Sequence, residues 1–586
     1  MARRVAGVVA LLAIAVTSML AVGEVTDRDA RAAHPGDDRS RGAPASPDVP
    51  PSATPSTTPS AVPHTVPPAP PGRPDIVLIL MDDFSLELLD TMPEAQRMVA
   101  EGATYDNAFV VNSLCCPSRA SILTGQMPHQ TGVLTNTPND GEHPIGGYEA
   151  FTAHGNGKRQ FSVTLQASGY RTGFVGKFLN RYSGEVVDGE LQPPPTVPGW
   201  TDWQALLGSA YSGWDFESTS LDADGRVELN RHRKPPRSAS VARRDRAYAG
   251  HVTTRKAVAF LEEQRAGDAP YFLEVATYAP HGQIEKAYAD NPQFPSAFRD
   301  RAAEGDPTGG NCGTRPCGEL GLEDLVGYDD PRGDNAPTYL LPGGRTAPAP
   351  PWRTNELTLS DQEALTYYRD RARMVQSVDR MIKEVREAAG PDAYVVLTSD
   401  NGFHLGQHQL NGGKGTPYDS DSRVPLVVVG PGVVPGVRHQ FVNNIDLAPT
   451  FEELAGVRTP RYRSGRSFAA SLTAPEAPGA RYAFFEHTYA MAQPGEVDAD
   501  RGSGGTIDII PSYVAIRGEE GLLVRVDLDP SWTGTDHAYE LYRYDRPWED
   551  TNVFAEDHDE PYARDLMRRL RRLEGCAPAE CRAAVR

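Results

Sequence analysis

Short, continuous apolar runs recur along this chain, separated by stretches with a helical pattern. The runs are 75–81 (DIVLILM), 172–175, 271–277, 394–398 and 426–429. Runs of this length without polar alternation are typical of strands that are buried on both faces. A long helical pattern at 360–389 lies between two of them. The alternation predicts an α/β domain with a mostly parallel sheet flanked by helices.

The pattern changes after about residue 480. Residues 513–516, 521–527 and 538–544 indicate short antiparallel strands, and 562–573 indicate a helix. We therefore predict a main domain at 73–479, followed at 480–586 by a smaller C-terminal α+β subdomain with an antiparallel sheet.

The N-terminal segment is typical of a protein for export. Arg3 and Arg4 precede an apolar run at 5–22, and the small residues at 21–23 (AVG) offer a cleavage site. We predict a signal peptide at 1–23, a secreted protein and no stable membrane span after cleavage. An uncleaved anchor is the alternative, because the run is near the lower length limit for a span. Residues 24–72 are charged and then rich in Pro, Ser and Thr, which predicts an extended linker.

Charge and cysteine content narrow the class of protein further. The formal net charge of −20 argues against a nucleic-acid partner but still allows a local basic pocket for an anion. The chain has 6 cysteines. Cys312 with Cys317, and Cys576 with Cys581, are spaced to close small disulfide loops, with a zinc site as the alternative. Cys115 and Cys116 are adjacent, and neighbouring cysteines pair badly.

Polar residues follow four of the predicted strands. Asp82 and Asp83 follow the first, Lys177 the second, His281 the third, and Asp400 with Asn401 the fourth. Ligands in open α/β sheets bind beyond the carboxyl ends of the strands. The aspartates and Asn401 are hard oxygen donors that suit calcium, whereas Lys177, His281 and Lys414 suit an anion. Taken singly, each also fits a turn, a helix cap or a solvated side chain.

The segment Cys115–Gly125 (CCPSRASILTG) carries the most specific motif. It resembles the signature of the formylglycine-dependent type I sulfatases, Cys-x-Pro-Ser-Arg followed by Leu-Thr-Gly, with Cys116 at the variable position. The resemblance covers most of the chain from Arg73 to Arg582. It is closest to the N-acetylglucosamine-6-sulfatase branch of the alkaline phosphatase superfamily, which includes bacterial arylsulfatases. The segments that carry it are 115–129, 176–180, 199–200, 279–281 and 398–402.

This resemblance implies an alkaline-phosphatase-like fold and a formylglycine (3-oxoalanine) that a formylglycine-generating enzyme makes from Cys115. Pro117 favours a helix start there, where free N–H groups attract an anion. The implied Ca²⁺ ligands are the modified Cys115, Asp82, Asp83, Asp400 and Asn401. By the same analogy, the catalytic set is Cys115, Arg119, Lys177, His281 and Lys414. His281 or Lys414 protonates the leaving alcohol, and Arg119 offsets carboxylate charge.

The expected activity is hydrolysis of a sulfate monoester. The expected substrate is an aryl sulfate, another small sulfated molecule or a sulfated glycan. One alternative is a phosphomonoester or phosphodiester hydrolase of the same superfamily. Another is a catalytically silent binding protein in which Cys115 stays a thiol.

Three segments bear on details of that activity. Many sulfatases read Gly-Lys-x-His where this chain has Leu179 and then Asn180, so the base for sulfate release is open. His404 and His408 are candidate substitutes, and we expect both to be exposed loop residues. The loop 282–286 (GQIEK) departs from its relatives at the substrate rim. The strongly basic segment 231–246 fits either a guide for a sulfated polymer or a solvated hairpin and helix start.

Overall fold

The computed structural model describes residues 72–137, 143–329, 336–352, 359–488, 510–529, 536–544 and 551–586. The predicted signal peptide, and the predicted linker apart from Gly72, lie outside these residues. Among the helices that are described, none combines the length and the apolar character needed to cross a membrane.

A ten-stranded mixed sheet forms the centre of the main domain. Its strand order is β14 (Gly436–Asn443), β2 (Ala103–Phe109), β13 (Leu426–Val429), β12 (Ala393–Ser399), β1 (Asp75–Met81), β9 (Tyr271–Ala276), β3 (Arg171–Lys177), β6 (Asp202–Leu206), β7 (Phe216–Leu221) and β8 (Val227–His232). The run from β12 to β6 is parallel. All five apolar runs are strands, but β13 is antiparallel to β12. The predicted α/β class is confirmed.

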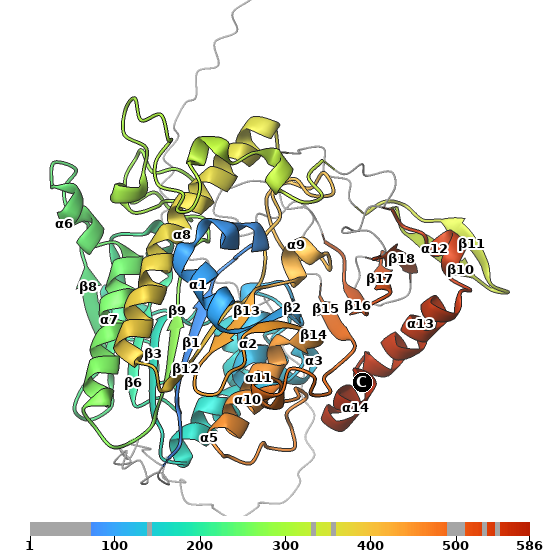
Figure 1. Cartoon of the computed structure of the whole chain (residues 1–586), viewed down its shortest axis with the longest axis horizontal. Coiled ribbons are helices and arrows are strands. Elements are labelled where there is room, and N and C mark those ends of the chain that lie inside the picture. The colour runs from blue at the N-terminus through green and yellow to red at the C-terminus, as the bar shows by residue number, and fades with distance from the viewer. Residues whose placement is uncertain are drawn as a thin grey trace, which may run out of the picture. The chain divides into compact units, whose positions relative to one another are not determined.

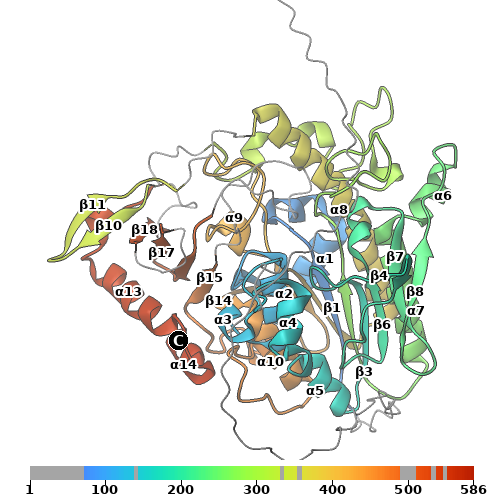
Figure 2. The ribbon, with the colours of Figure 1, turned by 180° about the vertical axis from the view of Figure 1, so that it is seen from behind.

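The alternation of side chains along β1 explains the layers on either side of the sheet. Ile76, Leu78 and Leu80 pack on one face with α2 (Cys115–Thr124), α5 (Phe161–Ala167) and α10 (Leu447–Leu454). The residues between them pack on the opposite face with α1 (Pro93–Glu101), α7 (Ala249–Arg265) and α8 (Asp361–Ala389). Figure 1 shows this second group of helices in front of the sheet, and Figure 2 shows the first group from behind.

A second, six-stranded sheet is antiparallel throughout. Its order is β11 (Arg345–Pro348), β10 (Thr338–Leu341), β18 (His537–Arg543), β17 (Gly521–Asp527), β16 (Tyr513–Arg517) and β15 (Ala483–His487). The predicted strands near 513, 521 and 538 are present, and α13 (Pro561–Leu573) packs on this sheet (Figure 1). β10 and β11 come from residues before α8, so the sheet is not built only from residues after 480.

Both predicted disulfide loops are present. Cys312 bonds to Cys317 and Cys576 bonds to Cys581, so the zinc alternative for these four cysteines is wrong. Cys115 and Cys116 are free and buried. The remaining described hairpin consists of β4 (Glu185–Val187) and β5 (Glu190–Gln192). The other described α-helices are α3 (Pro128–Thr131), α4 (Gly147–Ala153), α6 (Val241–Arg246), α9 (Asp419–Ser422), α11 (Ala469–Thr473), α12 (Phe554–Asp557) and α14 (Pro578–Ala584).

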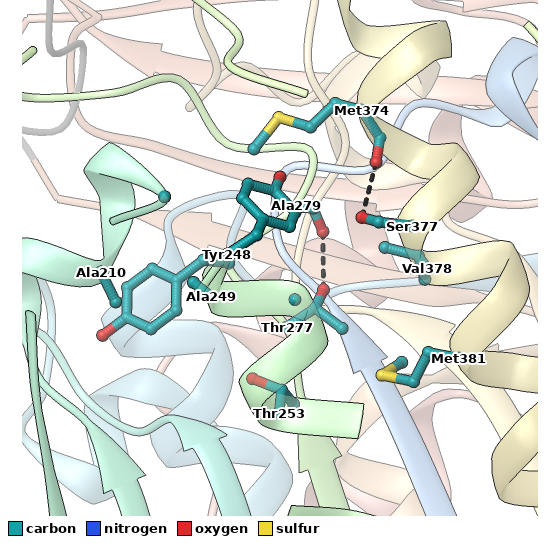
Figure 3. Close-up of a pocket in the computed structure, with 13 residues that line it drawn as sticks. Ala210, Tyr248, Ala249, Thr253, Thr277, Ala279, Met374, Ser377, Val378 and Met381 are labelled. Atoms are coloured by element: carbon teal, nitrogen blue, oxygen red, sulfur yellow. Dashed lines mark hydrogen bonds between the residues drawn. The ribbon is translucent and has the colours of Figure 1, made fainter. Parts of the chain in front are cut away.

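A small pocket lies where α7 and α8 meet the end of β9 (Figure 3). Its lining is mainly apolar, and its internal space of about 10 Å³ holds at most about one water molecule. On its wall, Thr277 Oγ1 donates a hydrogen bond to the Ala279 carbonyl at 2.6 Å. The pocket is therefore too small for a substrate, and its wall supports the turn that leads to His281.

Candidate active site

The carboxyl ends of four neighbouring parallel strands converge on one edge of the sheet. β12, β1, β9 and β3 are adjacent in that order, and the residues that follow them face Cys115 at the start of α2. The gathered side chains are almost completely buried, with 0–2% exposure for Asp82, Asp83, Cys115, Arg119, Lys177, His281, Asp400 and Asn401, and 9% for Lys414. The structure thus brings all the residues named for the site into one buried cluster.

The acidic part of the cluster has the chemistry of a cation site. Ligand atoms of Asp82, Asp83, Asp400 and Cys115 all lie within 4.8 Å of one another. Asn401 Nδ2 donates to Asp83 Oδ1 at 2.7 Å, which turns the Asn401 amide toward the aspartates. Asn401 Oδ1 and Asp83 Oδ2 are buried and accept no hydrogen bond from any described residue. Buried oxygens without donors fit a hard cation such as calcium.

Three cationic side chains balance the carboxylates. Lys177 Nζ lies 2.7 and 2.8 Å from the two oxygens of Asp82, and Arg119 Nε lies 2.7 Å from Asp400 Oδ2. Lys414 Nζ lies 2.6 Å from Asp83 Oδ1 and 2.7 Å from Cys115 Sγ. Because these charges are buried, each pair is held in one geometry rather than exchanging with solvent.

His281 lies on the same side of the cluster as Lys414. Its Nε2 lies 3.5 Å from Asp83 Oδ2, and its Nδ1 lies 2.7 Å from the Gly282 carbonyl. Burial alone would raise the pKa of Asp83, but Lys414, His281 and Lys177 together lower it below its ordinary value. The Asp83 carboxylate is therefore kept ionised, as a cation ligand must be.

Cys115 is poorly suited to act as an unmodified thiol. Burial raises the pKa of its thiol well above the ordinary value, although Lys177 and Lys414 oppose the rise. The thiolate is the reactive form of cysteine, so a thiol in this position is a weak nucleophile. The surroundings of Cys115 therefore do not favour chemistry by the thiol itself.

The local structure of α2 fixes Cys115 against the acidic cluster. Cys115 is the first residue of the helix, and Ser118, one turn later, donates to the Asp400 carbonyl. Arg119 Nη1 also donates to the Lys177 carbonyl at 2.7 Å. One turn of helix is thus fastened to the ends of both β12 and β3, which explains why Ser118 and Arg119 accompany the cysteine.

Two residues that were not predicted from the sequence, Arg371 and Tyr211, support this site. Arg371 of α8 donates to the Asp83 carbonyl at 2.5 Å and to Ser85 Oγ at 3.0 Å. Asp83 itself has a left-handed backbone with φ of 59°. The Arg371 guanidinium also lies 4.4 Å from the ring centre of Phe403, just beyond the end of β12. Tyr211 packs against His281, with ring centres 4.5 Å apart, and lies 5.0 Å from Lys177 Nζ. A helical pattern does not distinguish Arg371 from its neighbours.

The expectation that His404 and His408 are exposed loop residues is wrong. Their exposures are 1% and 0%. His404 Nδ1 lies 2.9 Å from Asp421 Oδ1, and its backbone pairs with Gly413, next to Lys414. His408 packs against Tyr418, with ring centres 4.0 Å apart. Burial and these contacts hold both histidines in place. We infer that they stabilise the loop that carries Lys414.

The position where many sulfatases have a histidine is part of the core here. Leu179 is 4% exposed and belongs to the apolar cluster on the α2 face of the sheet. Leucine has no titratable group, so residue 179 cannot supply the base for sulfate release.

A glycine beside Lys177 provides a test of how tightly the site is packed. Gly176 has φ of +116°, and a Cβ added there would lie 1.7 Å from the Ala276 carbonyl oxygen in β9. We expect Gly176→Ala to lower the free energy of unfolding by about 3 kcal/mol through strain and overpacking. Chemical denaturation measures this loss. Gly208→Ala is the control, because its Cβ would meet nothing within 4 Å. Equal stability of the two variants would contradict the argument.

Comparison with known proteins agrees with this geometry. The sulfatase family model matches residues 74–457. An extracellular sulfatase SULF-1 homolog of Drosophila melanogaster is 30% identical over 406 residues, covering 67% of this chain and 31% of that protein. Human N-acetylglucosamine-6-sulfatase is 30% identical over 394 residues, covering 66% of this chain and 61% of that protein. The chain thus spans less than two thirds of the length of these relatives.

Solved structures share the fold. One, of a protein in complex with its substrate D-glucosamine-2-N,6-O-disulfate, has a TM-score of 0.58 at 21% identity and covers 86% of this chain and 98% of that one. A phosphonate monoester hydrolase from Silicibacter pomeroyi has a TM-score of 0.55 at 20% identity, covering 86% and 95%. The alkaline-phosphatase-like fold is common to them. With a family match over most of its main domain, the chain belongs to the sulfatase family.

Proposed function

We propose that this protein hydrolyses sulfate monoesters with a formylglycine derived from Cys115 and a calcium ion. The observation that supports the proposal is a buried cluster around Cys115. The side chains of Asp82, Asp83 and Asp400 lie on one side of Cys115, and Lys414 lies on the other. A cation site facing lysines suits a bridging anionic ester. The names of the relatives support sulfate as that anion.

The proposed ligands of calcium are Asp82, Asp83, Asp400, Asn401 and the modified residue 115. When bound, calcium would polarise a sulfate oxygen and lower the pKa of the attacking hydroxyl. The hydrate of formylglycine would offer two hydroxyls, one to attack sulfur and one to lose its proton as sulfate is expelled. A serine in its place would stall as a sulfated enzyme, because it has only one hydroxyl.

The chain's own cations have distinct tasks in this proposal. Lys177 and Lys414 bind the ester oxygens and stabilise the negative charge that develops on them. Lys414 and His281 are the two candidates for protonating the leaving alcohol, since both border the Asp83 side of the cluster. Arg119 holds Asp400 in place and offsets its charge.

The proposed substrate is a sulfated sugar or an aryl sulfate. Relatives named extracellular sulfatase and N-acetylglucosamine-6-sulfatase, and the solved complex with a sulfated glucosamine, support this class. The same relatives support a secreted location, which agrees with the predicted signal peptide. Maturation would require a formylglycine-generating enzyme as a partner.

Ester selectivity is the direct test of the function. The comparison is kcat/KM for 4-nitrophenyl sulfate beside 4-nitrophenyl phosphate, with metal and enzyme held constant. We expect the sulfate to be the better substrate. Clearly faster phosphate hydrolysis would favour the second candidate, a phosphoric or phosphonic ester hydrolase, for which the shared fold with the phosphonate monoester hydrolase is the supporting observation.

Removal of calcium gives a further prediction. Chelation should abolish turnover, and added Ca²⁺ should restore it. At about 100 times its Kd, calcium should stabilise the fold by about 2.7 kcal/mol, since it binds only the folded site. Thermal unfolding with and without Ca²⁺ measures this separately from activity. An unchanged Tm together with undiminished turnover in the chelator would contradict the calcium site.

A further inference from the structure

A group of exposed arginines gathers around the edge strand β8. Arg233 follows β8, Arg243 and Arg246 belong to α6, and Arg255 belongs to α7; all four side chains are exposed. Figure 1 and Figure 2 both show β8 and α7 next to each other at this end of the sheet, with α6 just beyond their ends. We call Arg233, Arg243, Arg246 and Arg255 the basic surface.

Two arginines of the basic surface, Arg246 and Arg255, are in direct contact. Arg255 Nη1 donates to the Arg246 carbonyl at 2.9 Å, which joins α7 to α6. Partial burial of the Arg255 side chain and the neighbouring charge of Arg246 lower the pKa of Arg255. Burial, followed by Lys256 and Arg255, lowers the pKa of His232 to about 4, so the end of β8 belongs to the same positive environment. The group concentrates like charge in a chain whose net charge is −20.

Several carboxylates near this surface already pair with other cations, whereas the exposed Glu228 of β8 and Glu384 of α8 form no ion pair within the described residues. Asp215 and Glu217 pair with Arg231, Asp290 pairs with Arg237 at 2.5 Å, and Asp245 lies 3.5 Å from Arg299 Nε. Burial and then Arg255 lower the pKa of His251, and the charge of Glu384 partly opposes them. Within the described part of the chain, none of the four arginines of the basic surface forms an ion pair. A polyanion would therefore meet uncompensated positive charge here.

The basic surface is connected to the loop that leaves the active site. Lys234 Nζ donates to the Ala287 carbonyl at 2.6 Å, and Tyr288 Oη donates to the Pro235 carbonyl at 2.7 Å. Together with the pair between Arg237 and Asp290, these contacts fasten residues 234–237 to residues 287–290. That second segment follows His281 by only a few residues. A chain bound along the basic surface would thus be led toward the rim of the catalytic cluster.

We propose that the basic surface binds the sulfated stretches of a polysaccharide whose end or branch is presented to the active site. The choice of a sulfated chain rests on the proposed function, whereas its recognition rests on the uncompensated arginines. Sulfate groups repeated along an extended polymer match a row of guanidinium groups, which bind such oxygens in pairs. Residues 231–246 are then an interaction site rather than only a solvated hairpin and helix start.

The test measures binding of a heparin oligosaccharide to the full protein by titration calorimetry at several salt concentrations. The variant is Arg243→Ala/Arg246→Ala/Arg255→Ala. We expect its Kd to rise by about tenfold or more, and the slope of log Kd against log salt to fall by about two to three. Turnover of 4-nitrophenyl sulfate should stay within about twofold, because screened surface charges act weakly at a distance. Unsulfated hyaluronan should bind much more weakly.

A matched control removes three exposed arginines from α13, which packs on the second sheet. The control variant is Arg564→Ala/Arg571→Ala/Arg572→Ala. An equal loss of heparin binding in both variants, or no loss in the first, would overturn the proposal. If heparin binding depends on the basic surface but no sulfate ester is hydrolysed, the proposed function fails and the polyanion site stands. If aryl sulfate is hydrolysed but heparin does not bind, only the surface fails.

Discussion

Replacing Cys115 by alanine should abolish sulfate ester hydrolysis, with kcat/KM falling by at least about a thousandfold, as for loss of other covalent nucleophiles. The residue lies at the centre of the cluster, 3.4 Å from Asp82 Oδ1 and 2.7 Å from Lys414 Nζ through its Sγ. Alanine leaves the start of α2 in place while removing the atom on which the proposed chemistry depends. Turnover of 4-nitrophenyl sulfate measures the loss.

The matched control is the neighbouring cysteine. Cys116 is equally buried but belongs to the apolar core, and its backbone N–H donates to Asn136 Oδ1. Cys116→Ala should cost about 1 kcal/mol in unfolding free energy and leave turnover largely intact, because only a small apolar group is lost. Equal inactivation by both substitutions would mean that the start of α2 is disrupted, and that Cys115 has no special role.

The chemical state of residue 115 separates an enzyme from a binding protein. Mass spectrometry of the peptide that contains Cys115, taken from native protein, should show the lower mass of an aldehyde in place of the thiol. The Cys115→Ser variant, which cannot be converted in the same way, should turn over at most once and retain a sulfated serine. A quantitative thiol at residue 115 in native protein would support the catalytically silent alternative.

The edge of the sheet that carries the site could be predicted from the sequence, because the carboxyl ends of parallel strands lie at the same edge. Asp82, Lys177, His281 and Asp400 follow β1, β3, β9 and β12, and the structure places those strands next to one another. Each strand was recognisable from its own apolar run. The rule that ligands bind beyond the carboxyl ends of such strands then predicts that the residues following them belong to the site.

Other features depend on contacts that no local pattern encodes. Arg371 reaches Asp83 from 288 residues away in the sequence, and nothing in its helix distinguishes it from other arginines that face outward. The burial of His404 depends on pairing with Asp421 and with Gly413 across the loop. β10 and β11 join the C-terminal sheet although α8 and β12 intervene in the chain. Such partners are chosen by tertiary packing, so a single sequence carries little signal for them.

Asp400→Asn should combine a loss of stability with a loss of calcium binding. Asp400 Oδ2 accepts a bond from Arg119 Nε at 2.7 Å, and its Oδ1 accepts one from the Asp83 backbone N–H at 3.2 Å. Both Asp400 and Arg119 are buried, so the neutral amide would remove the nearer counter-charge of the guanidinium and leave only Asp82, whose Oδ1 lies 3.8 Å from Nη2. Breaking one side of a buried ion pair costs about 3–5 kcal/mol. We expect a decrease of at least about 3 kcal/mol without calcium, measured by chemical denaturation.

The calcium response should change independently of that loss. In the unsubstituted protein, added Ca²⁺ should raise Tm because it binds the folded state alone. In Asp400→Asn the rise should be small or absent, since the amide replaces a charged ligand with a neutral one and Arg119 then repels the cation. Titration of Tm against Ca²⁺ concentration separates this effect from the lower starting stability.

Asp106→Asn serves as the control for charge removal alone. Asp106 lies 2.6 Å from His439 Nδ1 in a surface pair, where the His439 side chain is 81% exposed. Its loss should change stability by no more than about 1 kcal/mol and leave the calcium response intact, because exposed ion pairs contribute little. A full calcium response in Asp400→Asn would remove Asp400 from the ligand set. The remaining buried oxygens of Asp82, Asp83 and Asn401 would then have to hold the ion without the residue that ties β12 to α2.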